Sequence, residues 1–240
     1  MRTIYQDILN SMIQKKKLLA VLIDPEKMIL NKVSHFINKV NHSKVSHVFV
    51  GGSIVDDNAT EALVSEIKKH TKLPVILFPG DVTQITNKAD ALLFLSLISG
   101  RNPEYLIEKH IEAVSKLRET KLEIIPTGYI LIENGKETSV QKVTGTLPMP
   151  RHNVQDIINT AKAGEFLGMK IIYLEAGSGA AIPIDSIIIS KVKKELQIPL
   201  IVGGGIRSKI QLEDTYNSGA DMVVIGTAFE EDESFFDQLK

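Results

Sequence analysis

The chain has 240 residues, of which 43% are hydrophobic and 24% charged, so it can bury the core of one α/β domain. Its formal net charge of -1 provides no overall field that would attract nucleic acid, and we expect no nucleic-acid partner. The absence of cysteine excludes disulfides, thiolate metal sites and a cysteine nucleophile, and it fits a cytoplasmic protein.

The first segment, residues 1–17, contains no apolar run long enough for a signal peptide. Apolar stretches elsewhere in the chain are also far shorter than the roughly 20 residues of a membrane-spanning helix. We therefore expect a cytoplasmic protein, although a hydrocarbon substrate could bring it into transient contact with a membrane surface.

Short apolar runs rich in β-forming residues recur along the chain, and most are separated by segments with helical spacing, such as 58–70 and 184–196. The runs are continuous rather than alternating, as expected for strands covered on both faces. The predicted strands are residues 18–23, 47–50, 74–78, 91–95, 122–125, 171–174, 199–202 and 222–225. This order predicts the α/β class and a single (β/α)8 TIM barrel over residues 1–240.

Two segments depart from the regular alternation. Residues 129–152 are rich in Gly, Thr and Pro where a helix should follow the fifth strand, and we predict a long functional loop there. Asp56 and Asp57 resemble part of the aspartate-rich motif of chain-elongating prenyltransferases, but the spacing is incomplete. We predict instead that they cap the helix that follows.

Oxygen-bearing side chains follow the first two strands. Asp24 lies in the run Leu-Ile-Asp-Pro-Glu-Lys at residues 22–27, and Ser53 ends the run Val-Gly-Gly-Ser after the second strand. A carboxylate and a hydroxyl suit Mg²⁺, which keeps several waters and binds substrate phosphate oxygens. The alternative is that Asp24 simply caps a helix that begins at Pro25.

The sixth strand ends in Tyr173-Leu174-Glu175, followed by residues 176–179 with sequence Ala-Gly-Ser-Gly. Alternate strand residues point the same way, so Tyr173 and Glu175 should face the barrel mouth while Leu174 faces the helices. We expect Glu175 to be catalytic or to bind a hydroxyl. The alternative is a buried structural ion pair.

Glycines end the last two strands, in residues 203–205 and at Gly226-Thr227. Glycine lets backbone amides approach an anion closely, and a helix N-terminus adds a positive dipole. The pairing predicts a phosphate site at the barrel mouth, whereas tight strand-to-helix turns would explain either group alone.

Taken together, these motifs resemble the geranylgeranylglyceryl phosphate synthase family, and the match runs almost end to end. The motifs lie at residues 22–27, 49–53, 78–80, 97–103, 125–129 and 173–179 and at the two glycine strand ends. The resemblance implies an enzyme that transfers a polyprenyl group, expected to be geranylgeranyl, from its diphosphate to the sn-3 hydroxyl of sn-glycerol 1-phosphate. Such members form the ether bond of archaeal-type lipids and are mostly homo-oligomers, either dimers or hexamers.

Carried over by position, the resemblance puts Mg²⁺ on Asp24 and Ser53. For such a reaction we expect Glu175 to bind the glycerol and take the proton from its attacking hydroxyl, with Tyr173 fixing the orientation. The resemblance assigns sn-glycerol 1-phosphate to Tyr173, Leu174, Glu175, Ala176, Gly177, Ser178, Gly179, Gly204, Gly205, Gly226 and Thr227. One departure is Leu22, where another branch of the family has a lysine, so phosphate binding here should depend more on backbone amides.

The hydrocarbon tail requires an apolar trough, which we expect Phe78, Phe94, Leu95 and Tyr129 to line. Two alternatives remain. One is another phosphate-binding barrel enzyme, of isomerase, aldolase or thiazole-phosphate synthase type, although no strand plainly supplies the lysine of a Schiff-base aldolase. The other is a carrier without catalytic activity.

Overall fold

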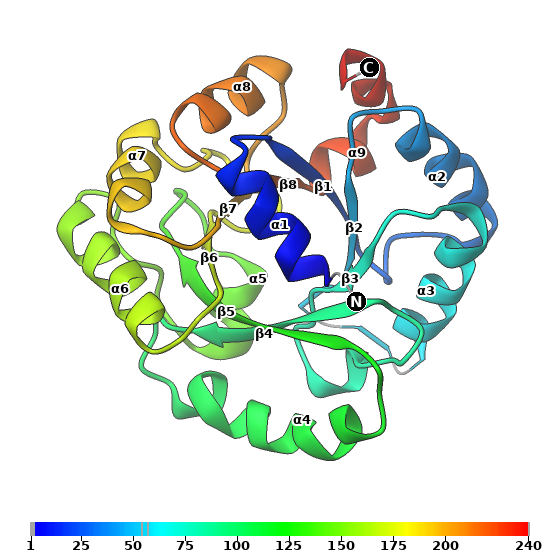
Figure 1. Cartoon of the computed structure of the whole chain (residues 1–240), viewed down its shortest axis with the longest axis horizontal. Coiled ribbons are helices and arrows are strands. Elements are labelled where there is room, and N and C mark those ends of the chain that lie inside the picture. The colour runs from blue at the N-terminus through cyan, green and yellow to red at the C-terminus, as the bar shows by residue number, and fades with distance from the viewer. Residues whose placement is uncertain (1–2, 54, 57, 240) are drawn as a thin grey trace.

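The computed structural model describes residues 3–53, 55–56 and 58–239. Eight parallel strands form a closed barrel in chain order, and the last strand pairs with the first (Figure 1). The strands are β1 (Leu18–Ile23), β2 (His47–Val50), β3 (Val75–Leu77), β4 (Ala91–Leu97), β5 (Glu123–Leu131), β6 (Ile171–Glu175), β7 (Leu200–Gly203) and β8 (Met222–Ile225). The predicted α/β barrel is therefore confirmed.

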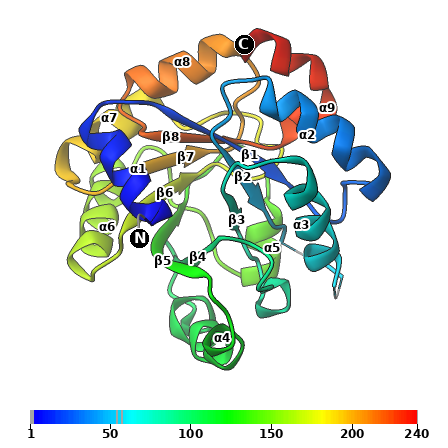
Figure 2. The same cartoon turned by 45° about the vertical axis from the view of Figure 1, so that its right-hand side comes forward.

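Helices surround the barrel, and α2 and α3 lie side by side outside strands β2 and β3 (Figure 2). The α-helices are α1 (Ile4–Ile13), α2 (Val33–Asn41), α3 (Ala59–His70), α4 (Lys109–Arg118), α5 (Ser139–Thr144), α6 (Val154–Phe166), α7 (Ser186–Glu195), α8 (Lys209–Asn217) and α9 (Thr227–Glu231). Shorter 3-10 or π turns are η1 (Leu30–Lys32), η2 (Val82–Gln84), η3 (Glu104–Glu108) and η4 (Glu233–Leu239).

The period of two along each strand divides the core into two layers. Inward residues such as Phe49 and Ile76 form one buried cluster inside the barrel. Outward residues such as Val48 and Leu77 pack against the helices in a second cluster, where α2 contributes Phe36. Each fully buried aliphatic or aromatic side chain stabilises the fold by roughly 1.5–3 kcal/mol, so both faces of every strand contribute.

Helix α1 crosses the barrel at the N-terminal ends of the strands (Figure 1). The carboxylate of Glu123, at the start of β5, accepts hydrogen bonds from the backbone N–H groups of Ile4 at 2.6 Å and Tyr5 at 3.1 Å. These are donors that a helix N-terminus leaves unpaired. Ile8 is fully buried in the inner cluster. The helix thus closes one end of the barrel.

The structure corrects two sequence predictions. Residues 129–152 are not one irregular loop, because β5 continues to Leu131 beside β6 and α5 forms within the segment, starting from a capping box made by Thr138 and Gln141. Asp56 does not cap α3, whose N-cap is Asn58. Asp57 lies outside the described residues. No described helix has the length and apolar character needed to cross a membrane.

Candidate active site

A cavity of about 350 Å³ lies at the C-terminal ends of the strands, and it brings together most of the predicted site residues. Those lining it are Asp24, Ser53, Tyr173, Glu175, Gly177, Ser178, Gly179, Gly204, Gly205, Gly226 and Thr227. Leu174 and Ala176 belong instead to the outer buried cluster, so their side chains face the helices. The predicted alternation along β6 is confirmed, with Tyr173 in the inner cluster.

Glu175 is a buried carboxylate at the base of this cavity. Burial raises its pKa to about 7, although the backbone N–H of Gly177 donates to Oε1 at 2.6 Å and acts in the opposite direction. Among the ion pairs of the described residues, none involves Glu175, which argues against the alternative of a structural ion pair. A carboxyl group with this pKa can exchange a proton near neutral pH.

The hydroxyl of Tyr173 is buried, and its polar contact is with the carboxylate of Glu175. Burial, followed by the charge of Glu175, raises its pKa well above the usual value, so the phenol stays protonated. The hydroxyl fits only because residue 203 is glycine, since a Cβ there would overlap it. Phenol and carboxylate therefore form one buried polar pair, and both groups line the cavity.

The loops after β6, β7 and β8 meet through glycines. Gly177, Gly179, Gly204 and Gly205 have φ between 64° and 105°, a conformation that other residues rarely adopt. A Cβ at Gly204 would lie 2.5 Å from Oε1 of Glu175 and 2.8 Å from the backbone nitrogen of Gly177. The loops can therefore approach closely and present backbone amides to one point, which is a typical anion-binding arrangement.

Thr227 links the segment after β8 to the loop after β6, because its Oγ1 accepts a hydrogen bond from the backbone N–H of Gly179 at 3.2 Å. Leu22 also lines the cavity and lies under Gly226, with its Cβ 3.4 Å from a Cβ built there. Leu22, the departure noted in the sequence, therefore borders this arrangement of backbone amides.

Asp24 and the end of β2 form a second polar corner. Asp24 Oδ1 accepts the N–H of Glu26 at 3.0 Å, so the side chain does stabilise a turn, although the next helical element, η1, begins only at Leu30. A Cβ at Gly52 would lie 2.8 Å from the same Oδ1, which shows how closely β2 approaches the carboxylate. The side chain of Gln84 fixes Gly52 by bonding both its N–H at 3.2 Å and its carbonyl at 2.7 Å.

The donor set at this corner is sparse. The described residues contain no cluster of three or more His, Cys, Asp or Glu side chains that could hold a metal ion. Zinc sites normally use three or four protein ligands, so they do not fit this corner. Mg²⁺ often binds one or two protein oxygens together with water and substrate phosphate, so Asp24 and Ser53 fit it.

The other half of the cavity is apolar. Phe78, Phe94, Leu95 and Tyr129, the residues predicted to line a trough, all line it. The rings of Phe78, Tyr129 and Tyr173 lie 5.3 to 5.9 Å apart between centroids and join the apolar half to the polar half. One cavity therefore combines an anion-binding end, a carboxylate near neutral pKa and a hydrocarbon trough.

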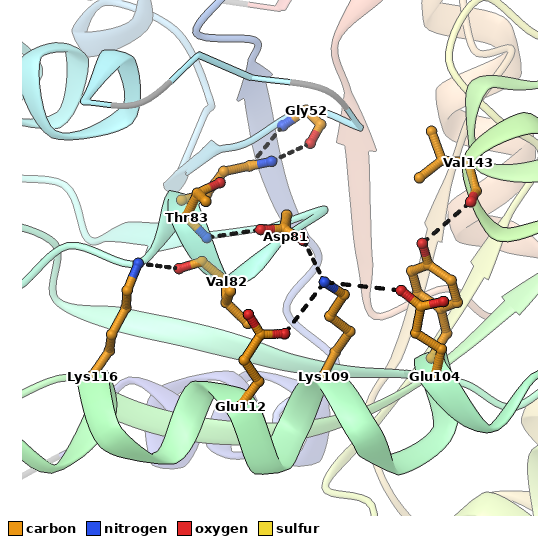
Figure 3. A network of polar contacts seen from close by, with 11 residues as sticks. Gly52, Asp81, Val82, Thr83, Glu104, Lys109, Glu112, Lys116 and Val143 are labelled. Carbon is orange, nitrogen blue, oxygen red and sulfur yellow. Dashed lines mark hydrogen bonds and ion pairs between the residues drawn. The ribbon is translucent and has the colours of Figure 1, made fainter.

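A network of polar contacts holds the outer wall of the trough together (Figure 3). Lys109 of α4 contacts Asp81 at 3.0 Å, Glu112 at 3.3 Å and Glu104 at 3.9 Å, and the bond to Asp81 raises the pKa of Lys109. Lys116 donates to the carbonyl of Val82 at 3.1 Å. This wall could not be predicted from the sequence, because charges spaced three or four residues apart also fit a solvated helix face.

The cations at the cavity mouth were also missed. Lys27 and Arg207 both line it, and Arg207 contacts Glu231 at 3.0 Å. Lys27 belongs to the motif at residues 22–27, but its partner on α9 lies 203 residues away in the chain and could not be inferred from spacing.

Comparison with known proteins gives a match to the PcrB family over residues 10–240. The geranylgeranylglyceryl phosphate synthase of Zunongwangia profunda is 57% identical over 218 residues, which cover 91% of this chain and 93% of that protein. The protein of the same name from Flavobacterium johnsoniae is 52% identical over 235 residues, which cover 98% of this chain and 97% of that protein.

A solved structure extends the similarity to the whole fold. The crystal structure of (S)-3-O-geranylgeranylglyceryl phosphate synthase from Thermoplasma acidophilum, in complex with its substrate sn-glycerol-1-phosphate, has a TM-score of 0.93 and 32% sequence identity. It covers 100% of this chain and 96% of that one.

Proposed function

The chain belongs to the PcrB family, and on that premise we propose that it joins a polyprenyl diphosphate to the sn-3 hydroxyl of sn-glycerol 1-phosphate. Geranylgeranyl diphosphate is the expected donor, and the product is an ether-lipid precursor. The observation that carries the proposal is the single cavity in which an anion-binding end and Glu175 adjoin an apolar trough. A structural neighbour in complex with sn-glycerol-1-phosphate supports the choice of acceptor.

The acceptor binds at the glycine loops in this proposal. Backbone amides of residues 177–179, 204–205 and 226–227 receive its phosphate, and the buried hydroxyl of Tyr173 orients the glycerol. Glu175 accepts the proton of the attacking hydroxyl, a role for which a pKa of about 7 is well matched. Leu174 and Ala176 contribute only backbone groups, since their side chains face the helices.

The donor places its hydrocarbon tail in the apolar half of the cavity. Each buried methylene contributes about 0.8 kcal/mol, so a long prenyl chain can supply much of the binding free energy. The bond between the allylic carbon and the diphosphate oxygen breaks, and the acceptor oxygen forms the new ether bond. The faces of Phe78, Tyr129 and Tyr173 lie where they can stabilise the positive charge that develops on the allylic carbon.

Mg²⁺ is the proposed metal. Asp24 and Ser53 would hold it, and its charge would neutralise the departing diphosphate. Exhaustive chelation should abolish turnover, and addition of Mg²⁺ should restore it.

The alternatives fit the site less well. An isomerase or aldolase acting on a small sugar phosphate has no use for the apolar half of the cavity, and the eight described strands contain no lysine for a Schiff base. A carrier without activity would not need a buried carboxylate with a raised pKa.

The test is to incubate the protein with labelled sn-glycerol 1-phosphate, Mg²⁺ and a ladder of prenyl diphosphates, and to identify the products. We expect an ether product from one preferred chain length, and little product from sn-glycerol 3-phosphate. Binding of both substrates without product would favour the carrier, and conversion of the acceptor without any prenyl donor would favour another barrel enzyme.

Three further expectations from the sequence remain proposals. Family resemblance favours a homo-oligomer, either a dimer or a hexamer, and a monomeric mass in light scattering at micromolar concentration would contradict it. The cytoplasmic location and the transient contact with a membrane surface also stay predictions, which fractionation and vesicle sedimentation can test.

A further inference from the structure

Lys27 is a cation at the cavity mouth that the steps above do not use. It follows β1, and its Nζ lies 2.8 Å from Oε2 of Glu230 in α9 and 3.8 Å from Oδ2 of Asp24. All three side chains line the cavity. Lys27 therefore lies between the corner formed by Asp24 and the loop that follows β8.

The contacts of Lys27 keep it charged but contribute little to the fold. Partial burial acts to lower its pKa, but the hydrogen bond to Glu230 and the charges of Asp24 and Glu231 raise it above the usual value overall. The side chain is 49% exposed, and exposed ion pairs typically add at most about 1 kcal/mol to stability. An ion pair of this kind can exchange partners without disturbing the barrel.

The charges around Lys27 indicate which group could replace Glu230 as its partner. The cavity lining already contains the carboxylates of Asp24 and Glu230, and two further cations that line it are paired elsewhere, Arg207 with Glu231 and Lys109 with Asp81. A diphosphate adds further negative charge beside Asp24. Lysine carries three donors on a flexible stem, and Lys27 lies close enough to Asp24 to reach an anion bound at that corner.

We propose that Lys27 binds the diphosphate of the prenyl donor, and that its ammonium group pairs with Glu230 until the donor arrives. This inference rests on the proposed function. In the transfer step Lys27 keeps its proton and donates hydrogen bonds to phosphate oxygens that gain charge as the allylic bond breaks. Glu230 is the partner that Lys27 exchanges for the diphosphate.

Inorganic pyrophosphate is the probe, and its binding to the full chain in the presence of Mg²⁺ is measured by calorimetry. Lys27→Met should weaken pyrophosphate binding by about tenfold to a hundredfold, the usual contribution of a hydrogen bond to a charged group, whereas Lys27→Arg should keep most of it. The matched control is Lys39→Met, because Lys39 pairs with Glu233 at 2.8 Å and does not line the cavity. It should bind as the parent does.

Glu230→Gln separates this role from that of a structural link. If the pair merely links the two segments, both variants should lose binding equally. In the proposed role only Lys27→Met loses it, because Glu230→Gln keeps the cation and removes a competing carboxylate. In steady-state kinetics, Lys27→Met should raise the KM for the prenyl donor at least tenfold and change the KM for sn-glycerol 1-phosphate less than twofold.

The outcomes that overturn the inference are distinct from failure of the function. If the parent forms the ether product and Lys27→Met still binds pyrophosphate within twofold of the parent, the role of Lys27 is wrong. If Lys27→Met binds sn-glycerol 1-phosphate more weakly and pyrophosphate as the parent does, Lys27 acts on the acceptor, and the inference is also wrong. A parent that forms no product with any donor overturns the proposed function itself. Unchanged thermal melting of each variant verifies the fold.

Discussion

Replacing Glu175 with glutamine should make the protein more stable at alkaline pH, and it removes the proposed base. The pKa of this carboxyl is about 7 in the folded protein, because burial disfavours the charged form, against 4.5 ordinarily. Below pH 4.5 both the folded and the unfolded chain hold the proton, and above about 7 both lose it. Between these limits only the folded state keeps it, so stability falls as pH rises.

The magnitude follows from the two pKa values. Their difference corresponds to about 3 kcal/mol of folding free energy, lost between pH 4.5 and pH values above 7. Glutamine has nearly the same shape and never ionises, so Glu175→Gln should lack this loss. The glutamine accepts the same neutral hydrogen bond from Gly177 at both pH values, and the stronger bond to the ionised carboxylate of the parent is already included in the pKa of about 7.

Urea unfolding of the parent and of Glu175→Gln at pH 4 and pH 8.5 measures the effect. From pH 4 to pH 8.5, the free energy of unfolding of the variant should rise by about 3 kcal/mol relative to that of the parent. Glu165→Gln is a control in which the effect of pH on stability has the opposite sign. Burial acts to raise the pKa of Glu165, but hydrogen bonds from Lys162 and Gln197 lower it overall. This variant should therefore lose stability relative to the parent as pH rises. If the difference in unfolding free energy between the parent and Glu175→Gln were the same at both pH values, the pKa of Glu175 would not be raised by folding.

Four further predictions follow from the same geometry. The kcat/KM of the parent should rise with pH to a plateau above about 7, and Glu175→Gln should slow turnover by roughly 10²–10⁴ with little change in acceptor binding; normal turnover would place the base elsewhere. Asp24→Ala should abolish activity and leave the circular dichroism spectrum and melting unchanged, whereas Mg²⁺-dependent activity in this variant would move the metal site. Gly203→Ala should cost about 1–3 kcal/mol in urea unfolding because its Cβ overlaps the Tyr173 hydroxyl, and less in a Tyr173→Phe background; equal costs in both backgrounds would refute the contact. Lys109→Met should loosen the trough wall and raise the KM for the prenyl donor alone, so an equal rise for the acceptor would point to a general structural effect.

The barrel was predictable because its signals are local. The eight strands are continuous apolar runs, and period-two alternation alone placed Tyr173 inside and Leu174 outside. The glycine strand ends were predictable for a similar reason, since left-handed φ angles of the kind seen at Gly204 nearly require glycine.

The remaining features depend on contacts between distant segments or on weak local signals. Helix α5 was missed although Thr138 and Gln141 have capping-box spacing, because the surrounding composition resembled a loop. The pKa of Glu175 depends on burial by several strands, which spacing cannot report. The ion pairs of Lys27 with Glu230 and of Lys109 with Asp81 join elements whose neighbourhood exists only in the closed barrel.

The pairing of β8 with β1 has a consequence for how the protein must be made. Lys17, just before β1, donates to the carbonyl of Ala220, 203 residues away, and the backbone N–H of Leu18 bonds Asp221. A nascent chain that has not yet produced β8 carries β1 and β7 as open edges, and open edges pair readily with other chains. The cavity also lacks the part of its lining that follows β8 until then. Synthesis therefore leaves a late interval in which the nearly complete chain is inactive and most prone to aggregation.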